Sequence, residues 1–323
     1  MKEFLRNRIA AWARRRQGLD VPPFSFHRRR IYILPTGLGM AFTVMLVVML
    51  IAGINYGSSA AMFLTFLLGG FTLVCMHQCH RNLLRVFFVS ASAPPMFAGK
   101  PGVLRVVFSS DTSFARYGIE VAALKSPNVG TDVPARGQSH VDVPLPPSKR
   151  GTLLIDRLYV STSFPYNLFR AWTWVHFPIE VTVYPRPHGS LPMPSESGEK
   201  SGPRSMTIAG SDEWQGLRPF REGDSPRQVA WKAYARGAPL LVKEYTALGA
   251  ELRVFDYSQL PQLDIESRLE QLTRWIVDAE SRGERYALVL PGRTFEADSG
   301  PQHRHECLSA LASHGLTKDA DAR

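Results

Sequence analysis

Two long apolar runs near the start of the chain dominate its hydrophobic pattern. Residues 31–80 contain no Asp, Glu, Lys or Arg, and inside this gap residues 34–54 and 60–76 are apolar, separated by the polar, turn-forming residues 55–59. At about 1.5 Å per residue, the first run matches the roughly 30 Å hydrocarbon core of a bilayer, and the second is near the lower limit. The pattern predicts a hairpin of two transmembrane helices. A signal peptide would lack the second span, and a buried helical hairpin is the other alternative.

Residues 85–185 have a different pattern, made of short runs rich in β-branched and aromatic residues. Proline and glycine clusters separate the runs, so the region predicts a small β-sandwich. An aromatic corner at residues 164–169 is expected to pack in its core. The predicted strands cover residues 85–90, 103–108, 119–124, 140–143, 152–155, 158–161, 171–176 and 179–184.

The C-terminal part alternates between strand and helix patterns. Residues 186–205, rich in Pro, Ser and Gly, predict a flexible linker, and residues 206–316 predict a compact α/β portion. Strands are expected at 252–255 and 286–290 and helices at 265–281 and 303–314, which together favour a small parallel sheet. The last residues, 317–323, are expected to form a loose tail.

Charge is concentrated before the first apolar run. Residues 1–30 hold nine basic and two acidic residues, a net charge of +7 out of the chain's +10. By the positive-inside rule this arm is cytoplasmic, and two spans return the rest of the chain to the same side. Leu5, Ile9 and Trp12 recur at helical spacing, so the arm is either an amphipathic helix on anionic lipid or a disordered basic tail. The remaining +3 argues against nucleic-acid binding.

The segment at residues 216–244 is rich in charged and aromatic residues and contains the sequence signals of a capped helix. Ser225 and Gln228 form a capping box around a proline at the first helical position, and Asp224 adds negative charge there. A helix is predicted over 226–236, ended by Gly237 in a left-handed conformation, with a strand at 240–245. Its charges either bind an anion at the helix start or form salt bridges within the domain.

Motifs for catalysis are missing from the sequence. It has no Gly-x-Ser-x-Gly, no phosphate-binding Gly-x-x-x-x-Gly-Lys-Ser/Thr loop and no Gly-x-Gly-x-x-Gly. His305-Glu306 begins a zinc-protease pattern, but Ser309 stands where the second histidine is required. We therefore expect a protein that is not an enzyme and needs no cofactor.

Two clusters are weak candidates for metal binding. Cys75, His77, Cys79 and His80 gather at the end of the second apolar run, where they either ligate a soft metal or pack as small groups. Because Cys75, Cys79 and Cys307 make no disulfide framework, a reducing compartment is favoured.

The second candidate cluster follows a predicted strand. Asp256 and Ser258 could hold a hard cation such as Mg²⁺ or make ordinary polar contacts. The further hydroxyl expected two residues later is replaced by Leu260.

Four motifs in the charged segment carry a family resemblance. They are Leu-Arg-Pro-Phe at 217–220, Glu-Gly-Asp-Ser-Pro-Arg at 222–227, Trp-Lys-Ala-Tyr-Ala-Arg at 231–236 and Leu-Val-Lys-Glu at 241–244. Together with the paired spans and the β region, the chain resembles the bacterial domain of unknown function 58 family. The resemblance implies a two-pass inner-membrane protein, both termini cytoplasmic, with a von Willebrand factor A-like portion. It also implies a MoxR-type AAA+ ATPase and a transglutaminase-like membrane protein as partners.

The sequence thus predicts a membrane-anchored protein-interaction module that acts beside such an ATPase. The alternatives are an envelope-related hydrolase or transferase component and a metal-dependent A-domain adhesion module, although Leu260 interrupts the metal motif of such domains. The residues expected to organise the interaction surface are Arg218, Gly223, Asp224, Arg227, Trp231, Lys232, Arg236, Lys243 and Glu244.

Overall fold

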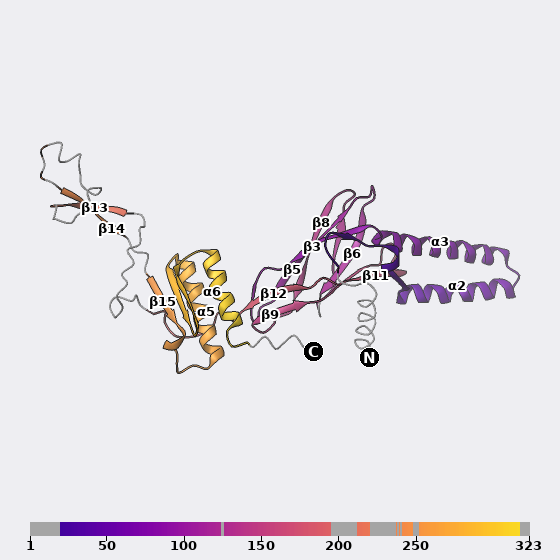
Figure 1. Cartoon of the computed structure of the whole chain (residues 1–323). Helices are drawn as coiled ribbons and strands as arrows, with labels where there is room; N and C mark the ends of the chain where they lie inside the picture. Colours follow the sequence, from indigo (N-terminus) through magenta and orange to yellow (C-terminus); the bar gives the residue numbers. More distant parts are fainter. Residues whose placement is uncertain are drawn as a thin grey trace. The chain divides into compact units, whose positions relative to one another are not determined.

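The computed structural model describes residues 20–123, 126–194, 212–219, 237, 239, 241–247 and 252–316. The chain forms two compact units, residues 1–186 with 309–323 and residues 187–308. The first unit holds a helical hairpin joined to β-sheets, and the second holds a small sheet with helices (Figure 1).

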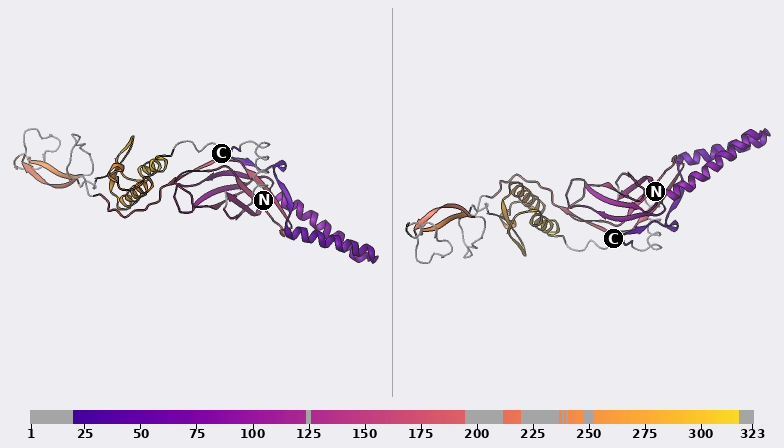
Figure 2. Two further views of the ribbon diagram at one scale, coloured as in Figure 1. Left: turned by 90° about the horizontal axis from the view of Figure 1, so that it is seen from below. Right: turned by 90° about the horizontal axis from the view of Figure 1, so that it is seen from above.

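The apolar runs fold into two antiparallel helices, α2 (Gly37–Asn55) and α3 (Ser59–Leu83), which lie side by side in every view (Figure 2). Ser58 caps α3 by accepting a hydrogen bond from the backbone N–H of Ala61. Gly57 in the connection has a φ of 61°, in the left-handed region that favours glycine. The predicted hairpin is confirmed, although α3 continues beyond residue 76 to Leu83.

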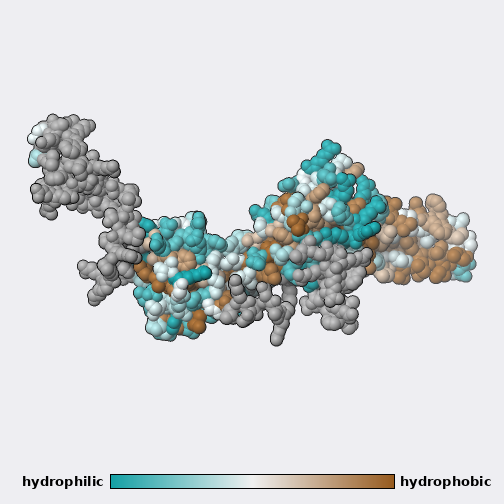
Figure 3. Space-filling view, viewed as in Figure 1, coloured by the Kyte–Doolittle hydropathy of each residue, from teal (hydrophilic) through white to brown (hydrophobic). Residues whose placement is uncertain are grey.

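Apolar side chains cover the outside of both helices, as the brown surface in Figure 3 shows. In the most apolar window of each helix, 11% of the residues are buried, whereas a core helix would be mostly buried. The hydroxyls of Thr43, Thr65 and Thr72 each donate to the carbonyl four residues earlier, at 2.8 Å. These hydroxyls therefore need no water. By length and composition, both helices could cross a membrane.

Three sheets make up the β part of the first unit. The eight predicted strands form, while β1, β2, β4 and β7 were not predicted. The first sheet has the order β1 (Phe24–Ser25), β3 (Val86–Ser92), β5 (Gly102–Ser110), β8 (Gln138–Leu145). The second has the order β2 (Tyr32–Pro35), β11 (Phe169–Val175), β10 (Leu158–Thr162), β6 (Arg116–Ala123), β7 (Val129–Val133). The third has the order β4 (Met96–Phe97), β12 (Ile179–Tyr184), β9 (Gly151–Ile155).

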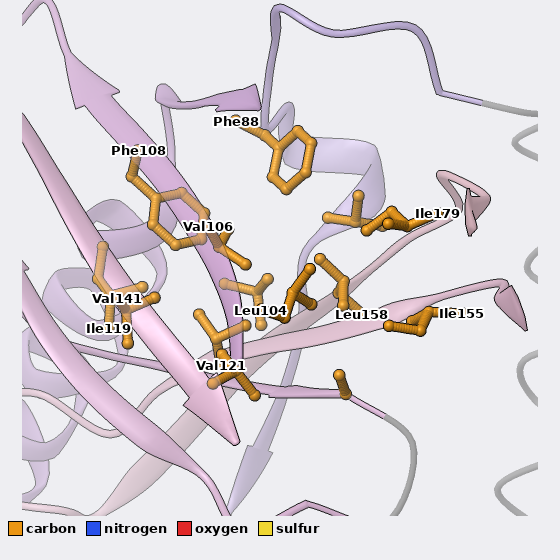
Figure 4. Packing of buried hydrophobic residues seen from close by; sticks show 14 of the residues in the cluster. Phe88, Leu104, Val106, Phe108, Ile119, Val121, Val141, Ile155, Leu158 and Ile179 are labelled. Carbon is orange, nitrogen blue, oxygen red and sulfur yellow. The ribbon is translucent and has the colours of Figure 1, made fainter. Parts of the chain in front are cut away.

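One hydrophobic core joins these sheets (Figure 4). Along β5, Leu104, Val106 and Phe108 are fully buried at alternate positions, as expected for a strand with one face inward. They meet Ile119 and Val121 of β6 in the same cluster. Burial of each such side chain contributes about 1.5–3 kcal/mol, so this core is the main stabilising element of the unit.

The predicted aromatic corner packs differently from our expectation. Leu168 is buried, but Phe164 is 42% exposed and Tyr166 is 67% exposed. Tyr166 and Asn167 both have positive φ, a conformation uncommon for residues other than glycine. The corner therefore presents Phe164 and Tyr166 at the surface, whereas Phe169 packs against the core as expected.

Residues that precede the hairpin also belong to the β part. β1 pairs with β3 and β2 pairs with β11, so residues 34 and 35, predicted as part of the first span, lie in a strand. The carboxylate of Asp20 accepts two hydrogen bonds of 2.7 Å from the guanidinium of Arg30 and one of 2.9 Å from the N–H of His176. Arg30, assigned to the basic arm, therefore anchors this segment. Leu5, Ile9 and Trp12 lie outside the described residues.

The end of α3 enters the β part through polar contacts. Asn82 is 5% exposed, and its amide nitrogen donates to the Tyr117 carbonyl at 2.7 Å and to the Thr162 hydroxyl at 2.8 Å. Its amide oxygen accepts from the Tyr117 N–H at 3.2 Å. The sulfur of Cys79 lies 3.5 Å from the Phe169 carbonyl oxygen. These contacts fix the rotation of α3 relative to the sheets.

The start of α2 is held equally closely. Thr36 accepts from the Gly39 N–H at 3.0 Å as the helix cap, and its own N–H donates to the Leu168 carbonyl at 3.0 Å. A Cβ on Gly39 would lie 1.9 Å from the Leu168 carbonyl oxygen, so a larger residue would push the helix away. Both helices are therefore rooted in the same unit.

The second unit begins its α/β portion with β15 (Leu252–Asp256), the short helix η3 (Tyr257–Gln259) and α5 (Ile265–Arg282). β16 (Arg285–Leu290) then pairs parallel with β15, as predicted. β17 (Arg293–Asp298), which was not predicted, pairs antiparallel with β16, so the sheet is mixed rather than parallel. α6 (Pro301–Ser313) is the last element, and the boundary between the two units falls within it, after Leu308.

Helix α5 has the signals that its sequence predicts. Asp264 caps its start by accepting from the Ser267 N–H at 3.3 Å, and Gly283 ends it with a φ of 68°. Its apolar side is buried against the sheet, and Leu269, Leu272 and Ile276 are fully inaccessible.

Part of the predicted linker packs on this helix. Gln271 exchanges two hydrogen bonds of 3.1 Å with the backbone of Leu191, and the Trp275 indole donates to the Leu191 carbonyl at 3.2 Å. Residues 187–194 therefore belong to the second unit as an ordered segment, and the linker prediction is wrong for them.

Candidate functional site

The charged segment that predicted an interaction surface is framed by a β-hairpin. β13 (Asp212–Pro219) and β14 (Leu241–Ala247) pair antiparallel, with a register shift between Trp214 and Gly216. The register places Leu217 opposite Lys243 and Gly216 opposite Glu244. The strand predicted at 240–245 is confirmed, and β13 was not predicted.

Three of the nine predicted surface residues lie in this hairpin, which brings their backbones together. Arg218 pairs with Val242, next to the pairs made by Lys243 and Glu244. Within the described residues the sheet has two strands, so each strand has a side without a neighbouring strand. Such edges offer backbone donors and acceptors to another chain.

The other six residues lie outside the described residues, and so does the predicted helix at 226–236. They are Gly223, Asp224, Arg227, Trp231, Lys232 and Arg236. Gly237 has a φ of 88°, which agrees with the left-handed residue expected after that helix. The helix and its anion or salt-bridge contacts stay predictions.

Asp256, the candidate metal ligand, makes a local contact at the end of β15. Its carboxylate accepts from the N–H of Ser258 at 2.8 Å and so caps η3, while the Ser258 side chain is exposed. Leu260, at the position of the missing hydroxyl, is buried. In the described part of the chain, no group of three or more His, Cys, Asp and Glu side chains could hold a metal ion.

The second unit contains a buried ion pair beside this strand. The guanidinium of Arg253 contacts the Glu284 carboxylate at 2.5 and 3.2 Å and donates to the Pro194 carbonyl at 2.7 Å. The hydrogen bonds from Arg253 hold the pKa of Glu284 below its ordinary value. The pair joins β15, the end of α5 and the 187–194 segment, so its role is structural.

Cys307 lies in a buried cluster with His303 and Tyr286. Its sulfur is 3.6 Å from the His303 Nε2, which in turn lies 2.9 Å from the Tyr286 carbonyl oxygen. Burial raises the pKa of the Cys307 thiol to about 12. A nucleophilic cysteine requires a lowered pKa, so the Cys307 thiol is suited to packing and not to nucleophilic attack. The neighbouring His305 and Glu306 are exposed.

The Cys/His cluster at the end of α3 does not assemble into a metal site. Cys75 and Cys79 are buried, and the Cys79 sulfur faces the carbonyl oxygens of Thr162 and Phe169, at 3.6 and 3.5 Å. His77 is exposed on another part of the helix surface. The packing alternative is therefore supported for the two cysteines.

Sequence reasoning missed the polar residues that hold the first unit together. Asp20, Asn82 and Arg116 are all buried, and each bonds to the backbone of a distant segment. The buried role of Asn82 could have been suspected because it is a neutral polar residue at a helix end whose other residues are apolar or basic. For Asp20 and Arg116 no local pattern indicates burial, because their partners are remote in sequence.

Comparison with known proteins gives no family for this chain. No protein-family model matches it, and no curated protein matches it. Function is therefore inferred from the residues and the geometry.

Proposed function

We propose that this chain is a membrane-anchored protein-interaction module and an accessory partner of a MoxR-type AAA+ ATPase at a bacterial inner membrane. Anchorage is carried by one observation, the exposed apolar surface of α2 and α3. Such a surface is far larger than the apolar patches that soluble monomers expose, and it calls for lipid or another apolar cover.

The direction of insertion follows from the distribution of charge about the hairpin. Arg28 and Arg29 lie before α2, and Arg81 and Arg85 lie at the end of α3, whereas the connection between the helices has no charged residue. Basic residues at one end of a hairpin favour the cytoplasmic side for that end. Both termini and both units are then cytoplasmic.

The interaction role is supported by the hairpin β13–β14 and the charged segment that it frames. The hairpin has free backbone edges in the described residues, and the segment supplies Arg, Lys, Asp and Trp side chains, which recur at protein interfaces. The motifs there resemble the domain of unknown function 58 family, from which the ATPase, the transglutaminase-like membrane protein and a von Willebrand factor A-like portion are expected.

Topology can be tested by labelling cysteines in intact cells with a membrane-impermeant maleimide. The native cysteines are all buried, so each test cysteine is introduced at an exposed site, Ser59→Cys at the first residue of α3 and Ser299→Cys in the second unit. We expect rapid labelling of Ser59→Cys in spheroplasts and labelling of Ser299→Cys only after lysis. Labelling of Ser299→Cys in intact spheroplasts would contradict the proposed orientation.

The partner can be tested by co-purification of the full chain from solubilised membranes with a nucleotide-locked MoxR-type ATPase. An Arg227→Glu/Arg236→Glu variant should lose recovery of the ATPase. A matched variant, Arg285→Glu/Arg293→Glu, reverses two charges on β16 and β17 and should retain it. Equal recovery with both variants, or none with the wild-type chain, would count against this partner.

A further inference from the structure

A cavity of about 620 Å³ lies at the end of α3 in the first unit. Its walls come from three segments: η1 (Arg28–Arg30), the last turns of α3 with the residues that follow, and the connection between β5 and β6. We call it the basal pocket. Its lining residues all belong to the first unit.

The lining of the basal pocket is strongly basic. Four arginines, Arg28, Arg81, Arg85 and Arg116, and one acidic residue, Asp111, give it a net charge of +3 with the histidines neutral. Asp111 is already engaged, because its carboxylate accepts from Arg85 at 2.9 Å. The other three arginines, Arg28, Arg81 and Arg116, therefore share the pocket with a single carboxylate that is already hydrogen-bonded to Arg85.

Arg116 shows most clearly that a ligand is expected. It is 5% exposed, and its Nη1 donates to the Arg81 carbonyl at 2.7 Å, while its Nε has no hydrogen-bond partner among the described residues. Burial lowers the pKa of this arginine, and the nearby charge of Arg81 lowers it further. A buried cation with an unused donor is costly, and an anion in the pocket would relieve that cost.

The position of the pocket indicates where the anion comes from. His77 and His80 of α3 line the pocket, while the preceding turns of the same helix expose apolar side chains such as Leu73 and Val74. A pocket at this point faces the layer in which lipid headgroups lie, provided that the hairpin spans a bilayer. Basic pockets at the cytoplasmic ends of transmembrane helices are suited to anionic headgroups.

Exposed aromatic side chains near the hairpin also support a position of the pocket at the layer of the lipid headgroups. Tyr166, 67% exposed, lies with its ring 5.4 Å from that of Phe71 on α3, and the rings of Tyr117 and Phe164 are 5.3 Å apart. Phe114 of the pocket wall lies under the Arg81 guanidinium at 4.6 Å. Tyrosine is enriched at the boundary between membrane and water, where its apolar ring and polar tip are both satisfied.

We propose that the basal pocket binds the phosphate headgroup of an anionic phospholipid, with Arg28, Arg81 and Arg116 as its ligands. Guanidinium groups make charge-assisted, bidentate hydrogen bonds to phosphate, and Arg28, Arg81 and Arg116 all belong to the lining of the pocket. The lipid source rests on the proposed membrane anchorage. Binding would tie the rotation of α3 and the position of the β-sheets to the headgroup layer.

The test uses the full chain purified in a non-ionic detergent and measures its thermal unfolding midpoint. It is titrated with dihexanoyl phosphatidylglycerol, dihexanoyl phosphatidylcholine or inorganic phosphate. We expect a saturable rise with the phosphatidylglycerol and at least about tenfold weaker binding of the other two probes. Equally tight binding of inorganic phosphate would overturn the lipid assignment, and no saturable rise with any probe would overturn the site.

Two matched variants separate the pocket from general charge. Arg28→Gln/Arg81→Gln removes two pocket charges and should weaken phosphatidylglycerol binding by about tenfold or more. Lys100→Gln/Lys149→Gln removes two charges outside the pocket and should change it by less than about twofold. Equal weakening in both would overturn the proposal. The unliganded midpoint checks folding, and Arg28→Gln alone, at an exposed position, gives the same test if the double variant unfolds.

Extraction of membranes with alkaline carbonate distinguishes this inference from the proposed function. If the chain stays in the membrane fraction but binds no phosphatidylglycerol, the basal-pocket inference fails and the anchorage stands. If carbonate releases the wild-type chain, the anchorage fails and the lipid source fails with it.

Discussion

The two helices that organise the units, α3 and α5, combine apolar and polar contacts in different proportions. α5 packs through an apolar stripe that includes Leu269, Leu272 and Ile276, and its ends are capped by Asp264 and Gly283. The end of α3 places Cys79 and Leu83 in the hydrophobic core of the first unit, and its directional contacts are the hydrogen bonds of the buried Asn82 amide to groups of the β-sheets.

The difference follows from the surroundings of each helix. A helix on the surface of a soluble unit has one apolar face, and burial of that face fixes its rotation. α3 is apolar on all sides along most of its length, so hydrophobicity favours one rotation only near its end, where Cys79 and Leu83 enter the core. Directional hydrogen bonds at its end can select one, because each donor and acceptor has one partner at one angle.

The largest effect is expected from breaking the apolar contact of α5. Leu269→Ala removes a fully buried side chain and should destabilise the second unit by about 2–5 kcal/mol. Hydrogen exchange followed by mass spectrometry should show faster exchange in residues 252–308 and no change in the β-sheets of the first unit. Ile265→Ala, at an exposed position of the same helix, is the control, and uniform destabilisation of both units would contradict their independence.

A smaller but more local effect is expected from breaking the polar contact of α3. Asn82→Ala removes the acceptor of the Tyr117 N–H and one of the partners of the Tyr117 carbonyl and of the Thr162 hydroxyl, at a cost of about 1–3 kcal/mol. Exchange should accelerate at the end of α3 and in β6 and β10. Gln78→Ala, at an exposed position one turn earlier, should leave exchange unchanged. Equal protection in Asn82→Ala would show that the apolar contacts suffice.

The stability of the second unit should also depend on pH, because this unit contains the ion pair between Arg253 and Glu284. Glu284 has a pKa below its ordinary value of 4.5 because Arg253 hydrogen-bonds its carboxylate. Its contribution is therefore fully present above pH 4.5 and is lost as the pH falls through the lowered pKa. The thermal midpoint of the second unit should fall in this acid range, and Glu284→Gln should flatten the fall. Glu296→Gln, at an exposed position on β17, should keep it.

Sequence alone predicted the elements whose signals are local. α5 was expected at 265–281 and spans Ile265–Arg282, because the apolar spacing that predicts it lies within the helix itself. The end of α3 was missed because His77, Arg81 and Asn82 read as the polar flank of a span, while their partners are far along the chain. The antiparallel β17 was missed because Pro291 and Gly292 read as an end rather than as a turn between strands.

The predicted interaction surface stays a prediction, and the pocket at the end of α3 was found only from the structure. The charged segment was recognised from its motifs, but only Arg218, Lys243 and Glu244 lie in the described hairpin. The basal pocket was not anticipated, because Arg28, Arg81 and Arg116 come from three segments that meet only in the folded unit. Residues brought together by tertiary contacts leave no periodic signal in the sequence.

The smallest expected effect is a change in the labelling rates of two buried cysteines, which report on α3 and on the second unit in one experiment. Cys79 lies at the end of α3 and Cys307 lies in the second unit, and both are buried. With a pKa of about 12, roughly one in ten thousand Cys307 side chains is a thiolate at pH 8, so maleimide labelling requires opening of the unit. Asn82→Ala should accelerate labelling of Cys79 alone, and Leu269→Ala should accelerate labelling of Cys307 alone. Peptide mass spectrometry measures both rates, with Ser299→Cys as the exposed reference. Acceleration of both cysteines by either variant would mean that the polar and apolar attachments belong to one cooperative unit.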